Sequence, residues 1–545
     1  MTKTGNKAVR SEAGKLALGL VFVALVIIPL LKMFSFIEGQ GFIRLVRSPV
    51  FGRAALHSLS ASLFATVISV TLALLLAWCL RRTRVRGTGV FSVLFILPML
   101  IPSVSIGMGL TILFGSNGIV TNLLDLRQTI YGFRGIVIGS VIYSFPVAFL
   151  MLNDAMKYED ASPYEAASVL GISKWRQLLS IELPYLKRAL ISASFSVFTM
   201  TITDYGVPLM VGGKCSTLSV MMYQEVIGQL DFGKGSAIGL FLLIPALIAF
   251  VADLLNRERA KASFVTRPFE LRKNSFRDGF AYIVCGLVAA AAAVLIGSFC
   301  VLAFSGKYPK DMSFTFKHVL ETFDLSGGEY LFNSLLIALG TSVVGIVAAF
   351  TTAYLTARMP SKTTKFLHLM SVVSLAVPGV VLGLSYALTF NGSFIYGTII
   401  ILIMVNLMHF FASPYLMMYN SLGKLNSNLE SVGQTLGISR WRIVKDVIIP
   451  QSKGTILEMF AYFFVNCMMT ISAVSFLATI STKPLALLIN QLEAQAKLEC
   501  VAVVSLLILA VNMLVKGIVY ILQRKKLSLP VRGKKEKSIV DAKTI

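Results

Sequence analysis

Charged residues are scarce in this chain, and their scarcity excludes an ordinary soluble domain. Asp, Glu, Lys and Arg make up 14% of the 545 residues, whereas soluble proteins carry roughly 25%. Hydrophobic residues reach 56%, and the mean hydropathy is +0.78. A helix needs ~20 apolar residues to cross the bilayer, and runs of that length recur along the whole chain. The sequence therefore predicts an integral membrane protein.

The chain also lacks the motifs that would give it chemistry of its own. No Gly-x-x-x-x-Gly-Lys-Ser/Thr loop occurs, because Gly213 and Lys214 are followed by Cys215, and no Gly-x-Ser-x-Gly elbow occurs either. The six cysteines form no CxxC pair and no Cys/His group at metal-ligand spacing, and we interpret them as packing residues. The four histidines include no metal-site pair: His57, His318, His368 and His409. We predict no catalytic residue, no metal and no cofactor on this chain.

The formal net charge of +24 is explained by membrane topology, and we do not expect nucleic acid as a partner. Lys and Arg gather in short loops on the cytoplasmic side of membrane proteins. Here they follow the second and sixth apolar runs, and they recur in the loop 358–365 and in the C-terminal tail. Both termini are therefore predicted to be cytoplasmic, with the loops 35–52 and 306–330 outside. The first two clusters comprise Arg81, Arg82, Arg84, Arg86, Arg257, Arg259, Lys261, Arg267, Arg272, Lys273 and Arg277.

Twelve apolar stretches predict an all-α polytopic protein with about 12 transmembrane helices. The first, residues 16–34, is too long for a signal-peptide core and is expected to be retained. The predicted domains are a first half (1–255), a cytoplasmic linker (256–279), a second half (280–523) and a basic tail (524–545). The stretches are centred near residues 25, 68, 101, 143, 199, 244, 291, 343, 378, 406, 466 and 511.

A polar segment between apolar stretches occurs twice and reveals an internal duplication. Residues 162–184 and 427–450 share seven identities at a constant offset of 266 residues. Upstream, Pro102 and Gly107 match Pro378 and Gly383 at an offset of 276. Each half has six predicted spans, an even number, so the halves enter the membrane in the same orientation as a parallel repeat. The identities pair Leu170, Gly171, Ile172, Ser173, Trp175, Arg176 and Pro184 with Leu436, Gly437, Ile438, Ser439, Trp441, Arg442 and Pro450.

Each copy of this segment is expected to form two short helices separated by a glycine. In the first copy Ser162 is the predicted N-cap, with Pro163 at the first helical position and Glu165 closing a capping box. Gly171 ends this helix, and Ser173 caps the next one. The second helix then places four residues on one side: Trp175, Leu178, Leu179 and Glu182.

The second copy keeps this pattern, with Ser427 as the predicted cap and Glu430 three residues later. A single copy could equally be an amphipathic helix on lipid headgroups, with its Trp as an anchor. Two copies on the same side of two halves favour docking on a partner that is itself two-fold.

The two copies resemble the cytoplasmic coupling motif of permeases from ATP-binding-cassette (ABC) importers, with Glu-Ala-Ala, a later Gly and a later Leu-Pro. The second copy departs from it, with Ser431, Val432 and Gly433 in place of Glu-Ala-Ala. The resemblance covers nearly the whole chain and is to the ferric-iron, aminoethylphosphonate, thiamine and polyamine group of fused permeases. The coupling residues carried over are Glu165, Ala166, Ala167, Gly171, Trp175, Arg176, Pro184, Glu430, Gly437, Trp441, Arg442 and Pro450.

This resemblance implies a type I ABC importer fold in a bacterial cytoplasmic (inner) membrane. It also implies partners: two copies of an ATPase subunit that carry the ATP and Mg²⁺, and an extracytoplasmic substrate-binding protein. Of the two ATPase contacts, the one at residues 162–184 is expected to be the stronger.

Polar groups within spans are expensive, so they are candidates for the substrate pathway. Six lie in the equivalent fifth spans of the two halves: Asp204, Tyr205, Asn466, Thr470, Ser472 and Ser475. Alternatively, Asp204 lies at the outer end in water, and the hydroxyls bond their own helix backbone. Asn406 and His409 are weaker candidates, because hydrogen bonds between helices explain them.

Prolines and glycines within the spans have two interpretations each. The prolines break backbone bonds and suit either gating kinks or static packing. Glycines such as Gly107 and Gly383 more often allow a close contact between helices than act as hinges. The prolines are Pro98, Pro102, Pro146, Pro208, Pro378 and Pro414.

A transporter driven by an ion gradient is the alternative function, and it also fits a parallel repeat of six plus six spans. It needs intramembrane carboxylates, of which Asp204 is the plausible one. A membrane enzyme or scaffold would need clustered catalytic groups, which the sequence does not show. Residues 470–476 look closest to the iron and aminoethylphosphonate permeases, so those substrates are favoured.

Overall fold

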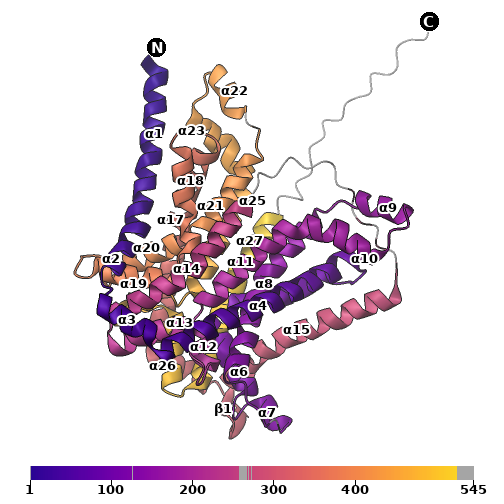
Figure 1. The fold of residues 1–545 in the computed structure, drawn as a ribbon, viewed down its shortest axis with the longest axis vertical. Helices are drawn as coiled ribbons and strands as arrows, with labels where there is room; N and C mark the ends of the chain where they lie inside the picture. Colours follow the sequence, from indigo (N-terminus) through magenta and orange to yellow (C-terminus); the bar gives the residue numbers. More distant parts are fainter. Residues whose placement is uncertain are drawn as a thin grey trace.

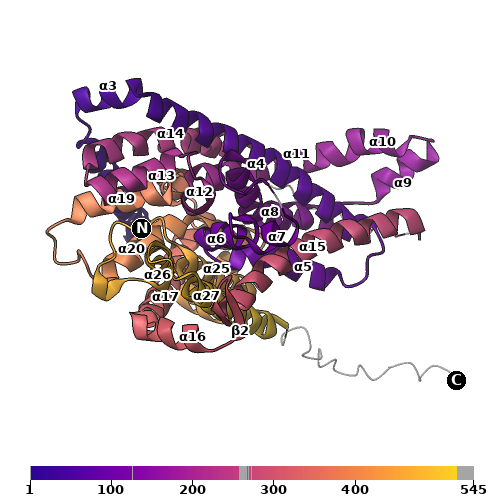
Figure 2. The ribbon, with the colours of Figure 1, turned by 90° about the horizontal axis from the view of Figure 1, so that it is seen from below.

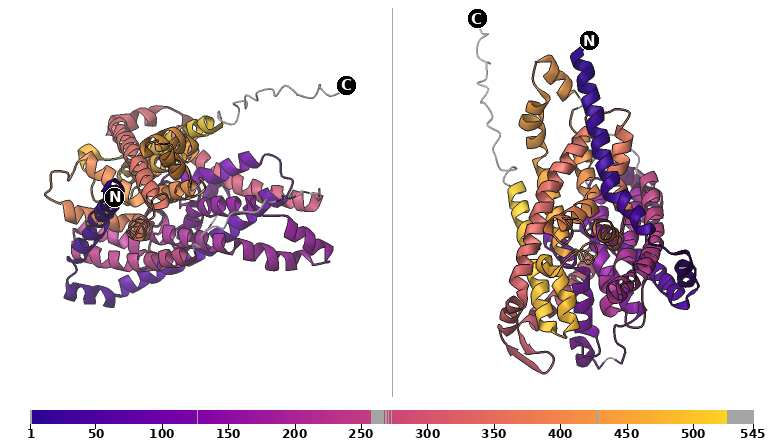
Figure 3. Two further views of the ribbon diagram at one scale, coloured as in Figure 1. Left: turned by 90° about the horizontal axis from the view of Figure 1, so that it is seen from above. Right: turned by 90° about the vertical axis from the view of Figure 1, so that its left-hand side faces the viewer.

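The computed structural model is an almost wholly helical bundle (Figures 1–3). It describes residues 2–125, 127–256, 267, 269, 271, 273–426 and 428–524. Within these residues, strands form one two-stranded antiparallel hairpin, β1 (Ser305–Lys307) with β2 (Asp311–Phe314). The predicted tail, 524–545, lies outside the described residues except for Arg524.

The first half contains helices α1 to α14. Its elements are α1 (Thr2–Phe22), η1 (Val23–Ile27), α2 (Ile28–Phe34), α3 (Gly39–Arg47), α4 (Pro49–Arg82), α5 (Thr88–Ile96), η2 (Leu97–Leu100), α6 (Ser103–Phe114), α7 (Ile119–Leu123), α8 (Phe133–Lys157), α9 (Ser162–Val169), α10 (Lys174–Gln177), η3 (Leu178–Glu182), α11 (Leu183–Thr203), α12 (Gly206–Val211), α13 (Leu218–Tyr223), η4 (Gln224–Gly228) and α14 (Phe232–Asn256).

The second half contains helices α15 to α27. Its helices are α15 (Ser275–Ala303), α16 (Lys317–Thr322), η5 (Phe323–Gly327), α17 (Gly328–Ala357), α18 (Thr364–Val372), η6 (Val373–Ala376), α19 (Gly379–Phe390), α20 (Ile399–Phe410), α21 (Ala412–Gly423), α22 (Leu429–Thr435), α23 (Arg440–Ile443), η7 (Val444–Ile448), α24 (Ile449–Gln451), α25 (Lys453–Met469), η8 (Ile480–Thr482), α26 (Leu485–Ala494) and α27 (Leu498–Arg524).

The predicted all-α membrane fold is confirmed, and each predicted span falls on helical structure. By length and hydropathy alone, eight helices of the described part could cross a membrane, or ten if two bent pairs each count as one span. The remaining two predicted spans are α11 and α25, at equivalent positions of the two halves. Neither meets the criteria of length and hydropathy for a membrane span, because Lys187 and Arg188 lower the hydropathy near the start of α11 and because α25 has 17 residues.

The duplication predicted from the sequence is visible in matching helix breaks. Before Pro102 the chain forms the 3₁₀ turn η2, and before Pro378 it forms η6; a 12-residue helix follows in both halves, α6 and α19. The second break bends the chain by 106°. The offset changes from 276 to 266 residues in the next loop, which holds α7 in the first half and is short in the second.

The first helix of each half packs on the opposite half. Helices α1 and α2 contact α18 and α19, whereas α15 contacts α5 and α6, the equivalents of α18 and α19. Lys15 on α1 donates to the Ser361 hydroxyl at 2.5 Å and to the Thr364 hydroxyl at 3.2 Å. This reciprocal exchange makes the hydrophobic cores continuous between the halves.

The prolines occupy several kinds of position. Pro102 and Pro378 mark the two matching breaks, Pro98 lies in η2 and Pro208 lies in the short helix α12. Pro146 stays inside the continuous α8, whereas the equivalent span of the second half divides into α20 and α21, bent by 53° before Pro414. Breaks therefore accompany some of these prolines but not all of them.

Candidate functional site: paired coupling segments and a central cavity

Each repeated segment folds as two short helices joined through a left-handed glycine, as predicted. Gly171 has φ +69° and Gly437 has φ +70°. The amide of Ile172 donates to the Ala167 carbonyl at 2.9 Å, and the amide of Ile438 donates to the Gly433 carbonyl at 2.8 Å. These bonds are the long-range bond of a Schellman C-cap, which requires a residue with positive φ after the helix. The same backbone geometry therefore occurs twice.

The serine caps of the second short helices are confirmed as well. The Ser173 hydroxyl accepts a hydrogen bond from the Arg176 amide at 3.4 Å, and the Ser439 hydroxyl accepts one from the Arg442 amide at 3.4 Å. A π-helical turn follows in both halves, η3 and η7, before the next helix begins at Leu183 (α11) or Ile449 (α24).

The predicted capping box on Ser162 is wrong. Helix α9 has Ala161 as its N-cap, and the amide and hydroxyl of Ser162 donate to Asp160 Oδ1 at 3.1 and 3.0 Å. Asp160, two residues upstream, therefore takes the bonds that a box would have used. The equivalent prediction on Ser427 lies outside the described residues, and α22 has Asn428 as its N-cap.

The predicted side of the second short helix also needs correction. Gln177 is its buried residue and donates to the Ile172 carbonyl at 2.8 Å, whereas Trp175 is 68% exposed. Trp441 is 71% exposed in the second half. Glu165, Ala166, Arg176 and Arg442 are also exposed, and Ala167 is buried. Each segment thus presents an exposed apolar surface, formed by Val169, Leu170 and Trp175 in the first half and by Val432, Leu436 and Trp441 in the second.

The second copy compensates internally for its missing Glu-Ala-Ala motif. Gly433 stands where the first copy has Ala167, and Ile443 stands where it has Gln177. A Cβ on Gly433 would lie 2.2 Å from Ile443 Cδ1. The smaller residue on α22 therefore makes room for the larger one on α23, and the helix pair keeps its shape.

A buried arginine at the end of the second span of each half holds the repeated segment of that half, which is the predicted coupling segment. Arg82 ends α4 and pairs with Glu159, and its Nε lies 3.7 Å from Glu182 Oε1. Burial raises the pKa of Glu159 and of Glu182, and the Arg82 guanidinium offsets this rise only in part. Arg82 Nη1 and Glu182 Oε1 are buried without a hydrogen-bond partner in the described part of the chain.

Arg358 is the equivalent residue of the second half, and its contacts are more complete. It donates to Glu430 Oε1 at 2.8 Å and Oε2 at 2.5 Å, and to the carbonyls of Leu425 and Asn426 at 3.1 and 2.7 Å. The bonds to Glu430 raise the pKa of Arg358. Glu430 therefore joins α22 to the end of α17, and its side chain is only 12% exposed.

The linker between the halves reaches the first coupling segment. The Arg267 amide donates to Asp160 Oδ1 at 3.0 Å, and the Ala161 amide donates to the Arg267 carbonyl at 3.0 Å. The bonds from Arg267 and Ser162 lower the pKa of Asp160. Arg82 Cζ lies 3.3 Å from the centroid of the Phe269 ring, so the linker also covers the arginine. The assignment of residues 256–279 as a separate cytoplasmic linker stays a prediction.

A cavity of about 500 Å³ lies between the halves and is lined by matching elements of both. The two helix breaks contribute Pro102 and Ser103 from the first half and Pro378 and Gly379 from the second. The ends of α11 and α25 contribute Asp204 and Thr470, which are equivalent in the repeat. Its other polar lining residues include Tyr143, Ser196, Thr199, Thr203, Asp253, Ser374, His409, Ser413, Tyr462, Asn466 and Ser472.

Four of the six predicted pathway residues line this cavity: Asp204, Asn466, Thr470 and Ser472. The other two lie behind it, where Tyr205 is 1% exposed and its hydroxyl is 2.8 Å from the Ser475 hydroxyl. The Asn466 amide donates to the Tyr462 carbonyl of its own helix, α25. The Ser475 hydroxyl donates to the Ile471 carbonyl, but both residues lie in the segment after α25 and not in a helix as the alternative interpretation expected.

The Asp204 carboxylate is held firmly at the cavity wall. It accepts hydrogen bonds from the Ser103 hydroxyl at 2.5 Å and from the amides of Gly206 and Val207 at 3.2 and 3.0 Å. The sequence pattern did not single out Ser103, because serine is common in these spans. His409 was ranked as a weak candidate but lines the cavity, whereas Asn406 is buried and bonds the carbonyl of Leu402.

The predicted close helix contacts at Gly107 and Gly383 are confirmed. A Cβ on Gly107 would lie 2.6 Å from Met210 Cβ, and one on Gly383 would lie 2.5 Å from the Ala473 carbonyl oxygen. Both glycines face the segment that follows the fifth span of their half. They fix the walls behind the cavity.

Two repeated helical halves, a polar cavity between them and paired exposed segments define a polytopic membrane permease. The chain belongs to the family of binding-protein-dependent transport system inner membrane components, whose model matches residues 69–262 and 342–528. The match covers more than half of the chain and falls once in each half. The chain is therefore the permease component of an ABC transporter with two fused homologous halves, and a multi-pass inner-membrane protein.

Several curated proteins are similar over different shares of the chain. A ferric transport system permease FbpB 1 from Haemophilus influenzae is 27% identical over 503 residues, 86% of this chain and 78% of that protein. The ferric transport system permease FbpB of Actinobacillus pleuropneumoniae is 27% identical over 508 residues, 88% of this chain and 73% of that protein. The thiamine transport system permease ThiP of Brucella abortus is 27% identical over 216 residues, 38% of this chain and 39% of that protein.

Proposed function

We propose that this chain is the permease of an ABC importer that passes ferric iron into the cytoplasm. An external substrate-binding protein delivers the iron, and two separate ATPase subunits with bound ATP and Mg²⁺ dock on the coupling segments. The proposal rests mainly on the two repeated segments. Each consists of two short helices separated by a glycine, and a buried arginine binds each segment to its own half. In Figure 1 they lie at the ends of two diverging groups of helices, with α9 and α10 on one and α22 and α23 on the other.

The exposed surfaces of the segments support docking on a partner protein. Val169, Leu170 and Trp175 are 88%, 76% and 68% exposed, and they flank Gly171 in the sequence. Exposed apolar patches rimmed by polar residues mark interaction sites. Closure of the two ATPases would draw the two segments together and open the cavity outward, because each segment is fixed to its own spans.

The cavity supports a small, strongly hydrated cation as the substrate. Its lining offers oxygen atoms from two carboxylates, Asp204 and Asp253, two phenols, Tyr143 and Tyr462, and several hydroxyls. Hard cations prefer carboxylate and other oxygen ligands. Two relatives that align over most of the chain are named for ferric transport, which favours ferric iron over aminoethylphosphonate.

The test is uptake by proteoliposomes that contain this chain, its ATPase and its binding protein. We expect uptake of chelated ferric iron only with internal ATP and with the binding protein outside. Uptake by the chain alone under a proton or sodium gradient would instead establish the ion-gradient alternative and overturn the proposal.

Replacing Asp204 with Asn tests the cavity as the pathway. Interactions of charged groups are worth about 1.5–3 kcal/mol, so we expect ferric uptake to fall by about tenfold to a hundredfold. The amide keeps the shape of the carboxylate, and its oxygen can still accept from Ser103, whereas its NH2 group cannot accept from the Val207 amide. Uptake is therefore expressed per amount of the variant found in the membrane. Asp231→Asn is the matched control, because Asp231 pairs with Lys234 away from the cavity. Equal uptake by the two variants would remove Asp204 from the pathway.

A further inference from the structure

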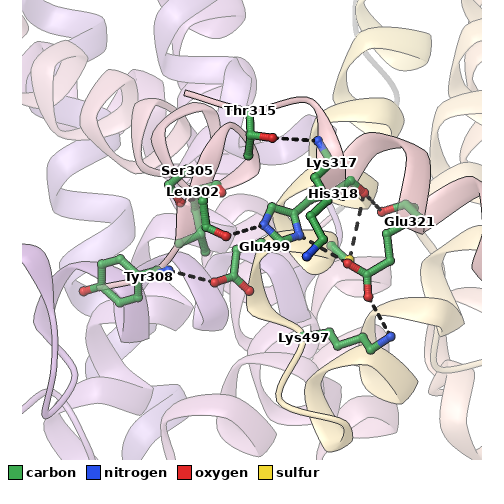
Figure 4. A network of polar contacts seen from close by, with 12 residues as sticks. Leu302, Ser305, Tyr308, Thr315, Lys317, His318, Glu321, Lys497 and Glu499 are labelled. Atoms are coloured by element: carbon green, nitrogen blue, oxygen red, sulfur yellow. Dashed lines mark hydrogen bonds and ion pairs between the residues drawn. The ribbon is translucent and has the colours of Figure 1, made fainter. Parts of the chain in front are cut away.

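A buried histidine, a carboxylate and a thiol meet at the end of the bundle where the hairpin β1–β2 lies. His318 and Glu321 lie on α16 (Figure 4). Cys500 lies near the start of α27. Their ligand atoms all lie within 4.8 Å of one another. Cys500 is far from His318 and Glu321 in the sequence, so neither CxxC spacing nor a histidine pair could have predicted the group.

The hydrogen bonds of His318 leave one ring nitrogen facing the group. Nε2 lies 3.0 Å from the Gly306 carbonyl oxygen, which can only accept, so Nε2 carries the proton. Nδ1 of the neutral ring then has a free lone pair, and it lies 3.4 Å from Glu321 Oε2. Two acceptors at this distance need a positive species between them. Histidines that bind metals almost always donate their other N–H to a carbonyl or carboxylate, as His318 does here.

The other groups fit a metal ion of intermediate softness. Cys500 is 1% exposed, and its thiol makes a weak contact of 3.9 Å with the His318 carbonyl oxygen. Lys497 binds Glu321 Oε1 at 2.8 Å and leaves Oε2 toward His318. Nitrogen, sulfur and oxygen ligands with bonds of about 2.0–2.3 Å are typical of Zn²⁺. Such bonds place tetrahedral ligands roughly 3.3–3.8 Å apart, close to the separation of Nδ1 and Oε2.

We propose that His318 Nδ1, Glu321 Oε2 and Cys500 Sγ bind one divalent cation of the Zn²⁺ class. Cys500 binds as the thiolate and releases its proton to solvent, and water completes the coordination. The ion links α16, which precedes the second span of the second half, to the start of the last span. Gly306 in β1 orients His318, so the hairpin is tied to the same point. This site is separate from the cavity and does not depend on the identity of the transported substrate.

Cobalt titration of the purified chain after chelator treatment tests the site, because a thiolate bound to Co²⁺ gives a charge-transfer absorption band. We expect one equivalent of Co²⁺ to bind with this band and Zn²⁺ to displace it. Cys500→Ser should abolish the band, and His318→Gln should weaken Co²⁺ binding by at least about tenfold. Zn²⁺ should raise the melting temperature of the unaltered chain but not that of His318→Gln.

Cys300→Ser is the matched control, since Cys300 is an exposed cysteine on α15, and it should retain the full band. If Cys500→Ser does not yield folded protein by size exclusion, Glu321→Gln replaces it and should lower the affinity by at least about tenfold. Absence of a stoichiometric band, or an equal band in Cys500→Ser, would overturn the proposal.

Discussion

Replacing Arg358 with Met is expected to release the second coupling segment from its half and to abolish coupled transport. The change leaves Glu430 and the carbonyls of Leu425 and Asn426 facing the end of α17 without their partner. Removing one member of a buried ion pair costs about 3–5 kcal/mol. Amide hydrogen exchange in α22 should therefore accelerate by at least about a hundredfold, since each 1.4 kcal/mol is a factor of ten.

Controls for Arg358 separate the ion pair from the loss of a positive charge. Lys362→Met removes an exposed cation from the same loop and should leave exchange and uptake unchanged. The double variant Arg358→Met, Glu430→Met should recover much of the stability, because both buried charges are then gone. If Arg358→Met alone exchanges like the unaltered chain, the arginine does not hold the segment.

Arg82→Met should act on the first segment in the same direction but less strongly. Arg82 Nη1 and Glu182 Oε1 already lack hydrogen-bond partners among the described residues, so fewer bonds are lost. Glu159 and Glu182 can also take up protons, because burial already raises the pKa of each. Arg84→Met is the matched control, since Arg84 is exposed just beyond the same helix.

Features set by local chemistry were predictable from the sequence. Gly171 and Gly437 follow from the need for positive φ after a helix, and Ser173 follows from capping rules. The cap on Ser162 failed because Asp160 and Arg267 bind there, and Arg267 belongs to the distant linker. A local sequence pattern gives no information about residues from another part of the chain that form hydrogen bonds at the same place.

The arginine contacts were missed because their acidic partners are not equivalent in the repeat. Glu159 aligns with Leu425, and Glu430 aligns with Tyr164. Comparison of the two halves therefore reveals neither of the two arginine–glutamate ion pairs. The packing of the first helix of each half on the opposite half could not be predicted either. An apolar helix can cover either half equally well, and only the packing shows that α1 lies on α18. Asp204, in contrast, stood out because a carboxylate within a span is rare.

Replacing Gly171 or Gly437 with Val is expected to uncouple transport from ATP hydrolysis without preventing membrane insertion. A Cβ at either position meets no atom within 4 Å, so no side-chain clash unfolds the chain. The strain is in the backbone, because a left-handed conformation costs an L-residue roughly 1–2 kcal/mol. A β-branched residue is the least suited to that region. The two short helices should reorient relative to each other. A conformational cost of about 1.4 kcal/mol corresponds to a factor of ten, so uptake should fall by at least about tenfold.

Asparagine at the same positions separates the backbone from the docking surface, because Asn adopts the left-handed conformation readily. Gly171→Asn and Gly437→Asn should keep uptake near normal, and so should Gly454→Val, where a Cβ is also unobstructed and φ is not left-handed. Substrate-stimulated ATPase activity and uptake that stay unchanged in both valine variants would contradict the coupling role. If the Glu-Ala-Ala surface of the first segment makes the stronger ATPase contact, Gly171→Val should lower uptake more than Gly437→Val.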